Sequence, residues 1–228
     1  MSRIRIVRFL PVLDFGGVES RTVTLGKCIN RDRFDYRVCA LSKAGNAGSV
    51  LREIGIEVDE LEQETNPRSV KSYSAFNAYI KQTQPHIVHS SISDANIRAA
   101  WARLTGSYFR LILEEVGVDP FRSFRARAVH GLAARVADLV IGVSRQTCEF
   151  LIERHGVPRE KIVFVNNSMD SRFIEIPPRV HSGKLKCLAV GRLVPEKNHG
   201  MLIDAFNILK NKVQILKRRM GRQQKFIL

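Results

Sequence analysis

Apolar residues along the chain alternate between short unbroken runs and longer stretches in which they recur every three or four positions. Short runs are typical of strands buried on both faces, and the wider spacing is typical of amphipathic helices. The pattern predicts strands at residues 4–10, 36–41, 56–61, 86–90, 110–115, 139–143 and 161–165. It predicts helices at residues 18–29, 48–54, 69–83, 94–105, 121–136 and 146–155, with Ser144 and Gly156 capping the last one. This alternation favours an α/β fold built on a parallel sheet.

The chain is predicted to divide at residues 174–184, which lack periodicity and contain its only Pro-Pro pair. We expect a Rossmann-like domain at residues 1–174, a linker at 175–184, and an incomplete second Rossmann-like domain at 185–210. The second part is expected to be a strand at 185–190 followed by a helix that starts near Met201. Residues 211–228 are expected to form a basic tail.

Two loops have the features of a phosphate site. Arg192 and Lys197 lie between an apolar run and a helix, where the helix N-terminus and the two cations together attract anions. Gly16 and Gly17 follow the first strand and precede a helix, so the backbone there can approach a ligand closely. Taken alone, the glycine pair is explained as well by a tight strand-to-helix turn.

These motifs, in this order, resemble the GT-B glycosyltransferases of family 4. Residues 190–206 resemble the opening of that family's donor-binding domain, in which the matching Arg and Lys grip the diphosphate of a nucleotide-sugar. Residues 85–106, 137–144 and 156–173 resemble successive parts of the first domain, with Ser168 at the place of a usual Gly. The resemblance covers residues 3–209, and it implies that Gly16 and Gly17 line the cleft between the two domains.

His89 and Glu115 are the catalytic candidates, because each ends a central predicted strand, where α/β sheets bind ligands. The alternative for His89 is a packing role with satisfied ring nitrogens, and the alternative for Glu115 is a capping or solvated carboxylate. Family members often have a His beside the reacting sugar. Here Val116 stands at the place where that His would fall.

The resemblance implies transfer of a sugar, with retention at the anomeric carbon, from a nucleotide-sugar to a saccharide or lipid-linked glycan acceptor in polysaccharide biosynthesis. It also implies no metal and no cofactor besides the donor substrate. The family's donor domain has two glutamates seven residues apart, and nothing after Lys210 supplies them. We therefore expect a C-terminally truncated enzyme with weak activity or none. The alternative is a non-catalytic acceptor-domain remnant that acts, if at all, as a binding protein.

Charge and cysteine content narrow the partners and the location. The net charge is +15, from 37 Lys and Arg against 22 Asp and Glu, and a basic surface attracts acidic membrane or nucleic acid. Without a helix-turn-helix pattern or a stacking platform, we expect no nucleic-acid partner, and peripheral contact with an acidic membrane is the remaining option. No apolar run approaches the roughly 20 residues that cross a bilayer. Four widely spaced cysteines indicate reduced core thiols and a cytoplasmic protein, with the inner membrane face as the place of any contact.

The basic tail has two interpretations. Its cations, counted from Lys210, are seven with no acid among them: Lys210, Lys212, Lys217, Arg218, Arg219, Arg222 and Lys225. Such a segment is either a frameshift or read-through product or a functional polybasic arm, and the first interpretation is preferred.

Overall fold

The computed structural model describes residues 3–117, 123–168, 187–191 and 193–219 of the chain. Contacts between residues divide the chain into two units, Met1–Ile174 and Glu175–Leu228. The predicted linker at residues 175–184 lies outside the described residues.

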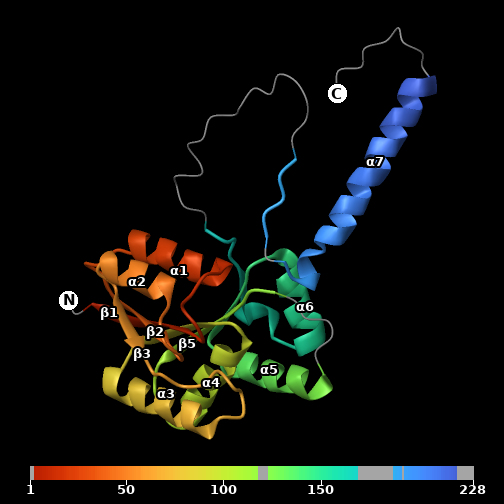
Figure 1. Cartoon of the computed structure of the whole chain (residues 1–228). Coiled ribbons are helices and arrows are strands. Elements are labelled where there is room, and N and C mark those ends of the chain that lie inside the picture. The colour runs from red at the N-terminus through yellow and green to blue at the C-terminus, as the bar shows by residue number, and fades with distance from the viewer. Residues whose placement is uncertain (1–2, 118–122, 169–186, 192, 220–228) are drawn as a thin grey trace. The chain divides into compact units, whose positions relative to one another are not determined.

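The first unit is built on one sheet of seven parallel strands (Figure 1). Their bounds are β1 Ile4–Leu10, β2 Phe34–Ala40, β3 Glu57–Glu60, β4 Ile87–Ser91, β5 Arg110–Glu115, β6 Leu139–Gly142 and β7 Ile162–Phe164. The order across the sheet is β3-β2-β1-β4-β5-β6-β7. Chain direction across the sheet reverses between β1 and β4, which is the point where open α/β sheets bind ligands. The α/β class and the parallel sheet predicted from the sequence are confirmed.

Six helices cover the two faces of the sheet. Their bounds are α1 Gly17–Cys28, α2 Asn46–Glu53, α3 Val70–Thr83, α4 Ser93–Leu104, α5 Phe124–Val136 and α6 Arg145–His155. Helices α1 and α2 lie on one face, and α3, α4 and α5 lie on the other (Figure 1). Right-handed crossovers require this arrangement, because the chain moves one way across the sheet up to β3 and the other way afterwards.

The core consists of two apolar clusters, one on each face. On the face of α3, the ring of Phe9 stacks on Phe76 with centroids 3.9 Å apart. On the opposite face, Leu10 and Val38 pack with Leu51 of α2. Neighbouring residues of β1 therefore enter different clusters, as the alternation of side chains along a strand requires.

The predicted caps of α6 are confirmed. The Ser144 hydroxyl accepts a hydrogen bond from the N–H of Thr147 at 3.0 Å, and Gly156 ends the helix in the left-handed region with φ 62°. The backbone N–H of Gly156 bonds to the carbonyl of Ile152. Both ends of this helix could be predicted from the sequence, because a serine hydroxyl caps a helix start and a glycine readily adopts the left-handed conformation that ends a helix.

The described part of the second unit differs from the prediction in two ways. Residues 187–190, part of the predicted strand at 185–190, form no strand. A parallel strand needs a neighbouring strand for its hydrogen bonds, and the described residues of this unit contain none. Helix α7 spans His199–Arg219, so residues 211–219 continue a helix where a tail was expected. Lys, Gln, Leu and Arg dominate that stretch and favour helix.

The structure corrects the prediction that the cysteines are core thiols. Cys39 is buried, but Cys28 and Cys187 are exposed, so the prediction is wrong for those two. Cys28 ends α1 at the surface, which the spacing of cysteines does not reveal.

None of the helices in the described ranges is long and apolar enough to cross a membrane.

Candidate functional site

Charged side chains from three adjacent strands meet at the carboxyl edge of the sheet, at the switch point between β1 and β4. Arg8 on β1 lies beside His89 on β4, and Ser91 on β4 lies beside Glu114 on β5 in the strand register. Arg8 is 1% exposed and Glu114 is 5% exposed. We call this group, together with Arg21 of α1, the Glu114 cluster.

Glu114 is the centre of the cluster and contacts groups on three elements, with hydrogen bonds from Arg8 and Ser91. Arg8 Nη2 lies 2.6 Å from its Oε2, and Arg21 Nη2 lies 2.5 Å from its Oε1. The Ser91 hydroxyl also donates to Oε2, and His89 Nε2 lies 3.5 Å from the same oxygen. Both carboxylate oxygens are thus occupied by donors, which fixes the side chain in one orientation.

The cluster strongly perturbs the protonation of its members. Burial opposes ionisation of Glu114, but contact with His89 and the charge of Arg8 outweigh burial and hold the pKa of Glu114 well below its ordinary value. Burial, followed by the charge of Arg8, lowers the pKa of His89 from 6.5 to about 4. His89 is therefore neutral near pH 7, with Arg8 Nη1 2.5 Å from its Nε2.

The charges in the Glu114 cluster do not balance. Two guanidinium groups face one carboxylate, so the cluster carries an excess positive charge in a largely buried place. The Nε of Arg8 and the hydroxyl of Tyr36 are buried without a hydrogen-bond partner among the described residues. Burying charges this way costs stability that an apolar core would not lose. Perturbed, costly charges at a ligand-binding edge indicate a functional site.

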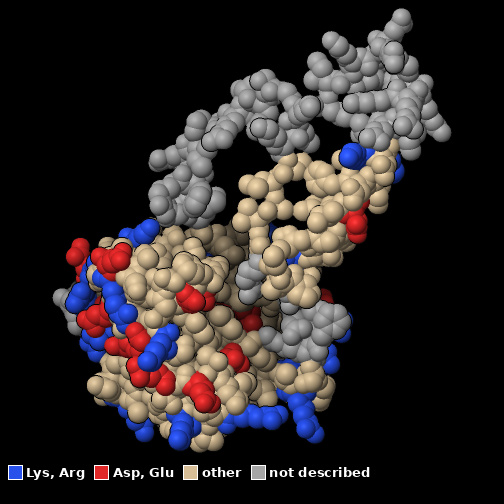
Figure 2. Space-filling model, viewed as in Figure 1, with Lys and Arg blue, Asp and Glu red and all other residues tan. Residues whose placement is uncertain are grey.

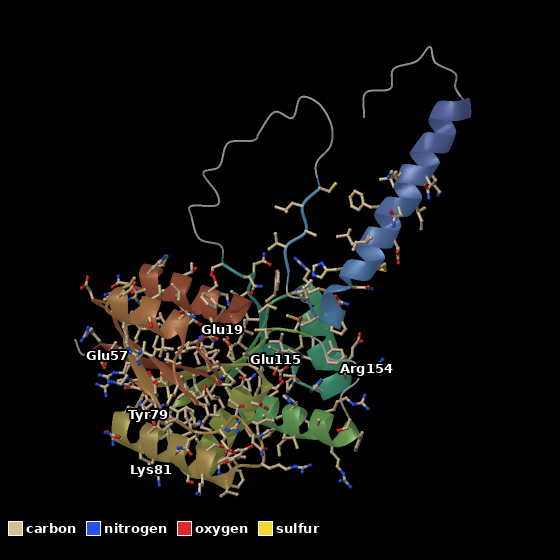
Figure 3. The ribbon with its side chains drawn as sticks, viewed as in Figure 1. Glu19, Glu57, Tyr79, Lys81, Glu115 and Arg154 are labelled. Atoms are coloured by element: carbon tan, nitrogen blue, oxygen red, sulfur yellow. The ribbon has the colours of Figure 1, made fainter. Side chains whose placement is uncertain are left out.

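Glu115, the next residue, belongs to a second network. Its Oε1 accepts from Asn96 Nδ2 of α4 at 2.9 Å and lies 3.7 Å from His130 Nδ1 of α5. The same Asn96 amide donates to the Glu114 carbonyl at 3.1 Å and accepts from the Ser90 hydroxyl at 2.7 Å. Glu115 is 9% exposed, so it is not a solvated surface carboxylate. Figure 3 shows it among the strands, where β5 ends. A catalytic role for Glu115 or His89 stays a prediction.

The backbone is strained where β4 meets α4. Ile92, between Ser91 and the first residue of α4, has φ 75° and ψ 139°. A positive φ is a real outlier for a β-branched residue, and such strain gathers where the surrounding structure imposes a conformation for function. Here it turns the chain sharply after Ser91, whose hydroxyl contacts Glu114.

The Gly16-Gly17 loop lies at the start of α1, as predicted. Gly16 is the extended N-cap residue, and a Cβ there would overlap the carboxylate of Glu19 in the first turn (Figure 3). A Cβ on Gly17 would have no atom within 4 Å. A Cβ at residue 16 would require only that the Glu19 side chain shift, so packing demands glycine at neither residue 16 nor residue 17. Because Glu19 already places a negative charge at this helix start, a phosphate could bind there only if Glu19 moves.

Arg21 joins α1 to the rest of the site. Its Nη2 pairs with Glu114, and its Nη1 donates to Oδ1 of Asn167, in the segment that follows β7. Burial and the charge of Arg8 act to lower the pKa of Arg21, whereas Glu114 acts to raise it, and the net direction is downward. One side chain thus holds the helix behind the Gly16-Gly17 loop against the carboxyl edge.

The other predicted phosphate residues belong to the second unit. Arg192 lies outside the described residues. Lys197 is exposed and ends the short 3₁₀ helix Pro195–Lys197. Asn198 follows with φ 45°, and its Oδ1 accepts from the N–H of Met201 in the first turn of α7 at 3.3 Å. Lys197 is therefore placed just before a helix N-terminus, which is the setting that the phosphate prediction requires.

Sequence reasoning missed Arg8, Arg21, Asn96 and Glu114. Two of them had a visible signal, because Arg8 and Glu114 interrupt otherwise apolar runs that were read as buried strands. A charge in such a run must be paired or functional. Arg21 and Asn96 lie on helices, and only the packing of those helices brings them to the edge. Across the described ranges, no three His, Cys, Asp or Glu side chains are grouped so that they could hold a metal ion.

Comparison with known proteins identifies the family. The sequence model of Glycosyltransferase Family 4 matches residues 15–173, which is more than half of the chain. The chain belongs to this family. The matched residues contain all of the Glu114 cluster except Arg8, as well as the Gly16-Gly17 loop.

Individual members and solved structures agree with this assignment. The capsular polysaccharide biosynthesis glycosyltransferase CapH of Staphylococcus aureus is 25% identical over 223 residues, covering 91% of this chain and 58% of CapH. Anabaena HepE, solved in complex with UDP and glucose, is 21% identical with a TM-score of 0.63, over 77% of this chain and 48% of HepE. A glycosyltransferase from Rickettsia africae has the same TM-score at 16% identity, over 77% of this chain and 46% of its own. The similarity to these two structures shows the Rossmann-like GT-B fold. The present chain spans about half the length of the relatives that it matches.

Proposed function

We propose that this chain forms the acceptor-side part of an enzyme that moves a sugar from a nucleotide-sugar to a saccharide or lipid-linked glycan, with retention at the anomeric carbon. The family match over residues 15–173 is the observation that carries the proposal. Two relatives add to it, since CapH is named for capsular polysaccharide biosynthesis and HepE was solved with UDP and glucose. The donor is therefore proposed to be a UDP-sugar.

The geometry suggests how the described residues would serve such a reaction. The Glu114 cluster carries excess positive charge at the carboxyl edge, and it would hold the edge rigid and favourable to an anionic ligand. Gly17 leaves space beside the start of α1 that the fold itself does not need. Lys197, with Arg192, would neutralise charge that develops on the leaving diphosphate. Glu115, held by Asn96, is the carboxylate best placed to orient an acceptor hydroxyl.

We also propose that the 228 residues alone transfer little or no sugar. Catalysis requires donor and acceptor to be held together in a reactive geometry, and such positioning supplies much of the rate. The chain spans 58% of CapH, and the described residues of the second unit form only the Pro195–Lys197 turn and α7. The second candidate function, a non-catalytic acceptor-domain remnant, rests on the same observation. Peripheral contact with an acidic membrane remains a proposal in either case.

Calorimetric titration with UDP tests the donor site. We expect weak binding to the chain and no detectable binding after Arg192→Ala with Lys197→Ala, because both phosphate cations are gone. Lys210→Ala with Lys212→Ala is the matched control, since it removes two exposed charges of α7 and should leave binding unchanged. Equal binding by the first pair and the parent chain would remove the phosphate assignment.

Gly17→Ala tests the first-unit part of the site. At a helix position, Ala is more favourable than Gly by roughly 0.5–1 kcal/mol, so the melting temperature should hold or rise. Binding of UDP or of an acceptor analogue should nevertheless weaken, because the added methyl fills the space beside the helix start. Unchanged binding with unchanged stability would show that residue 17 lines no ligand.

Activity is measured with purified chain against UDP-sugars and saccharide or lipid-linked acceptors. Product that accumulates over many turnovers would show that the chain is a competent enzyme by itself. Binding of an acceptor without any transfer would support the remnant.

A further inference from the structure

The outer surface of helices α3, α4 and α5 is strongly basic. Within their bounds these helices contain one acidic residue, Asp94, and seven cations: Lys71, Lys81, Arg98, Arg103, Arg125, Arg127 and Arg135. Only Arg98 of the seven is buried. Figure 2 shows Lys and Arg side chains along the lower rim of the molecule, where these helices lie in Figure 1. Helices α1 and α2, on the other face, mix acids such as Glu19 and Glu53 with their cations.

Large apolar side chains share this basic surface. Trp101 and Leu104 lie one turn apart on α4 and are 50% and 59% exposed. Val129 and Leu132 lie one turn apart on α5 and are 46% and 57% exposed. Arg125 precedes Val129 by one turn on the same side of the helix. Tyr108, in the loop between α4 and β5, and Phe124, the first residue of α5, are also exposed. We call these six apolar residues and the six unburied cations the α3–α5 surface.

The aromatic groups of this surface are held in place. The ring of Tyr73 on α3 meets the indole of Trp101 edge-on, with centroids 6.2 Å apart. The guanidinium of Arg103 lies over the ring of Tyr108, 5.3 Å from its centroid. Half of Trp101 thus faces outward from a fixed position between two helices. Tryptophan, tyrosine and arginine together are the side chains that prefer the boundary between lipid and water.

We infer that the α3–α5 surface binds the face of a lipid bilayer that contains anionic headgroups. The cations complement the negative surface, and the exposed Trp, Leu and Val side chains can enter the region between headgroups and acyl chains. Nucleic acid fits less well, because half of the six apolar residues, Leu104, Val129 and Leu132, are aliphatic and offer bases no ring to stack on. The inference rests on the proposed peripheral membrane contact and adds the residues that make it. Sugar transfer is not needed for it.

The chain contains a single tryptophan, and it lies on this surface. Trp101 emission is therefore a direct probe of binding by the whole protein. We expect vesicles of phosphatidylcholine with phosphatidylglycerol to shift the emission to shorter wavelength and to protect it from acrylamide. Vesicles of phosphatidylcholine alone should have little effect, because the electrostatic part of the attraction is absent.

Charge reversal on the surface tests the assignment. Lys71→Glu, Arg125→Glu and Arg135→Glu together should lower partitioning onto anionic vesicles on the order of 100-fold, since each basic residue near such a surface contributes about 1 kcal/mol. Lys27→Glu on α1, Arg33→Glu just before β2 and Lys43→Glu between β2 and α2 form the matched control outside helices α3–α5, with the same change of net charge. The control should lose far less. Circular dichroism of each variant verifies that it is folded.

The C-terminal cations need a control of their own. Replacement of Lys217, Arg218, Arg219, Arg222 and Lys225 by Gln should leave the Trp101 shift in place. If the C-terminal Gln variant loses vesicle binding and the Lys71, Arg125 and Arg135 triple variant keeps it, the protein binds membranes but not through the α3–α5 surface. If the unmodified protein does not respond to anionic vesicles, both are wrong. Binding of single-stranded RNA that the surface triple abolishes, without any response to vesicles, would assign the surface to nucleic acid.

Discussion

At the amino edge of the sheet, Arg5 pairs with Asp35 and Arg110 pairs with Asp138, and these side chains are between 19% and 70% exposed. At the carboxyl edge, Glu114 lies buried between Arg8 and Arg21. Both edges pair arginine with a carboxylate, but the pairs contribute differently to the free energy of unfolding. Exposed pairs are screened and contribute little, whereas a buried unbalanced cluster costs free energy unless every partner is present. The comparison separates a carboxyl edge that gathers buried, costly charges from an amino edge whose ion pairs lie nearer to water.

The amino-edge pairs serve the sheet itself. Asp138 accepts from the backbone N–H of Leu111 at 2.8 Å as well as from Arg110, so it replaces a ladder bond where β5 and β6 begin. Arg5 donates to the Thr83 carbonyl at the end of α3. Each of these side chains thus forms a hydrogen bond with a backbone N–H or carbonyl group close to its own end of the sheet. At the carboxyl edge, by contrast, side chains bind side chains from distant elements.

The largest effect is expected from Glu114→Gln. Loss of one partner from a buried ion pair leaves Arg8 and Arg21 unpaired and should cost about 3–5 kcal/mol in the free energy of unfolding. Glu57→Gln is the matched control, since Glu57 pairs with Arg37 but is 62% exposed. Urea unfolding of both variants measures the difference. Equal midpoints would mean that the two edges do not differ as described.

Acid should act on the carboxyl edge through His89. Its pKa falls from 6.5 to about 4 on folding, so the unfolded chain takes up the proton first as the pH drops. Stability should therefore be lost between about pH 6.5 and pH 4, with about 2 kcal/mol gone by pH 5. Urea unfolding at pH 7 and pH 5 measures this loss. His89→Gln, which cannot titrate, should show a smaller drop, and an equal drop in both proteins would place the acid sensitivity elsewhere.

A smaller and opposite effect is expected from Ile92→Gly. Glycine adopts positive φ without strain, so the variant should gain about 1 kcal/mol after the entropy cost of glycine is subtracted. Gln84, at the amino-edge end of α3, also has positive φ but lies in the left-handed helical region. Gln84→Gly should change stability less. A loss of stability in Ile92→Gly would show that the turn after Ser91 is not strained.

Arg110→Ala is expected to have the smallest effect. Its guanidinium is 70% exposed and touches Asp138, which keeps its bond to the Leu111 N–H without it. The unfolding midpoint should stay within experimental error of the parent at moderate salt. A shift as large as that of Glu114→Gln would contradict the contrast between the edges.

The sequence by itself determined the class and order of the α-helices and strands in the first unit, and their bounds to within three residues. Strands β1 and β5 were predicted to the residue, because short, mainly apolar runs are typical of strands buried on both faces of a parallel sheet. Helix α6 was fixed by Ser144 and Gly156 for equally local reasons. The family resemblance was also readable, since it depends on motifs in order and not on distances.

Only the tertiary structure decided which polar residues form the site. Glu114 and Glu115 are adjacent in sequence and look alike, but alternation along β5 sends them to different networks, one with Arg8 and Arg21 and the other with Asn96 and His130. Their partners come from residues as far apart as 8 and 130, and no local pattern encodes such a meeting. Residues 187–190, the described part of the predicted strand at 185–190, form no strand, because an apolar run becomes a strand only when neighbouring strands accept its hydrogen bonds.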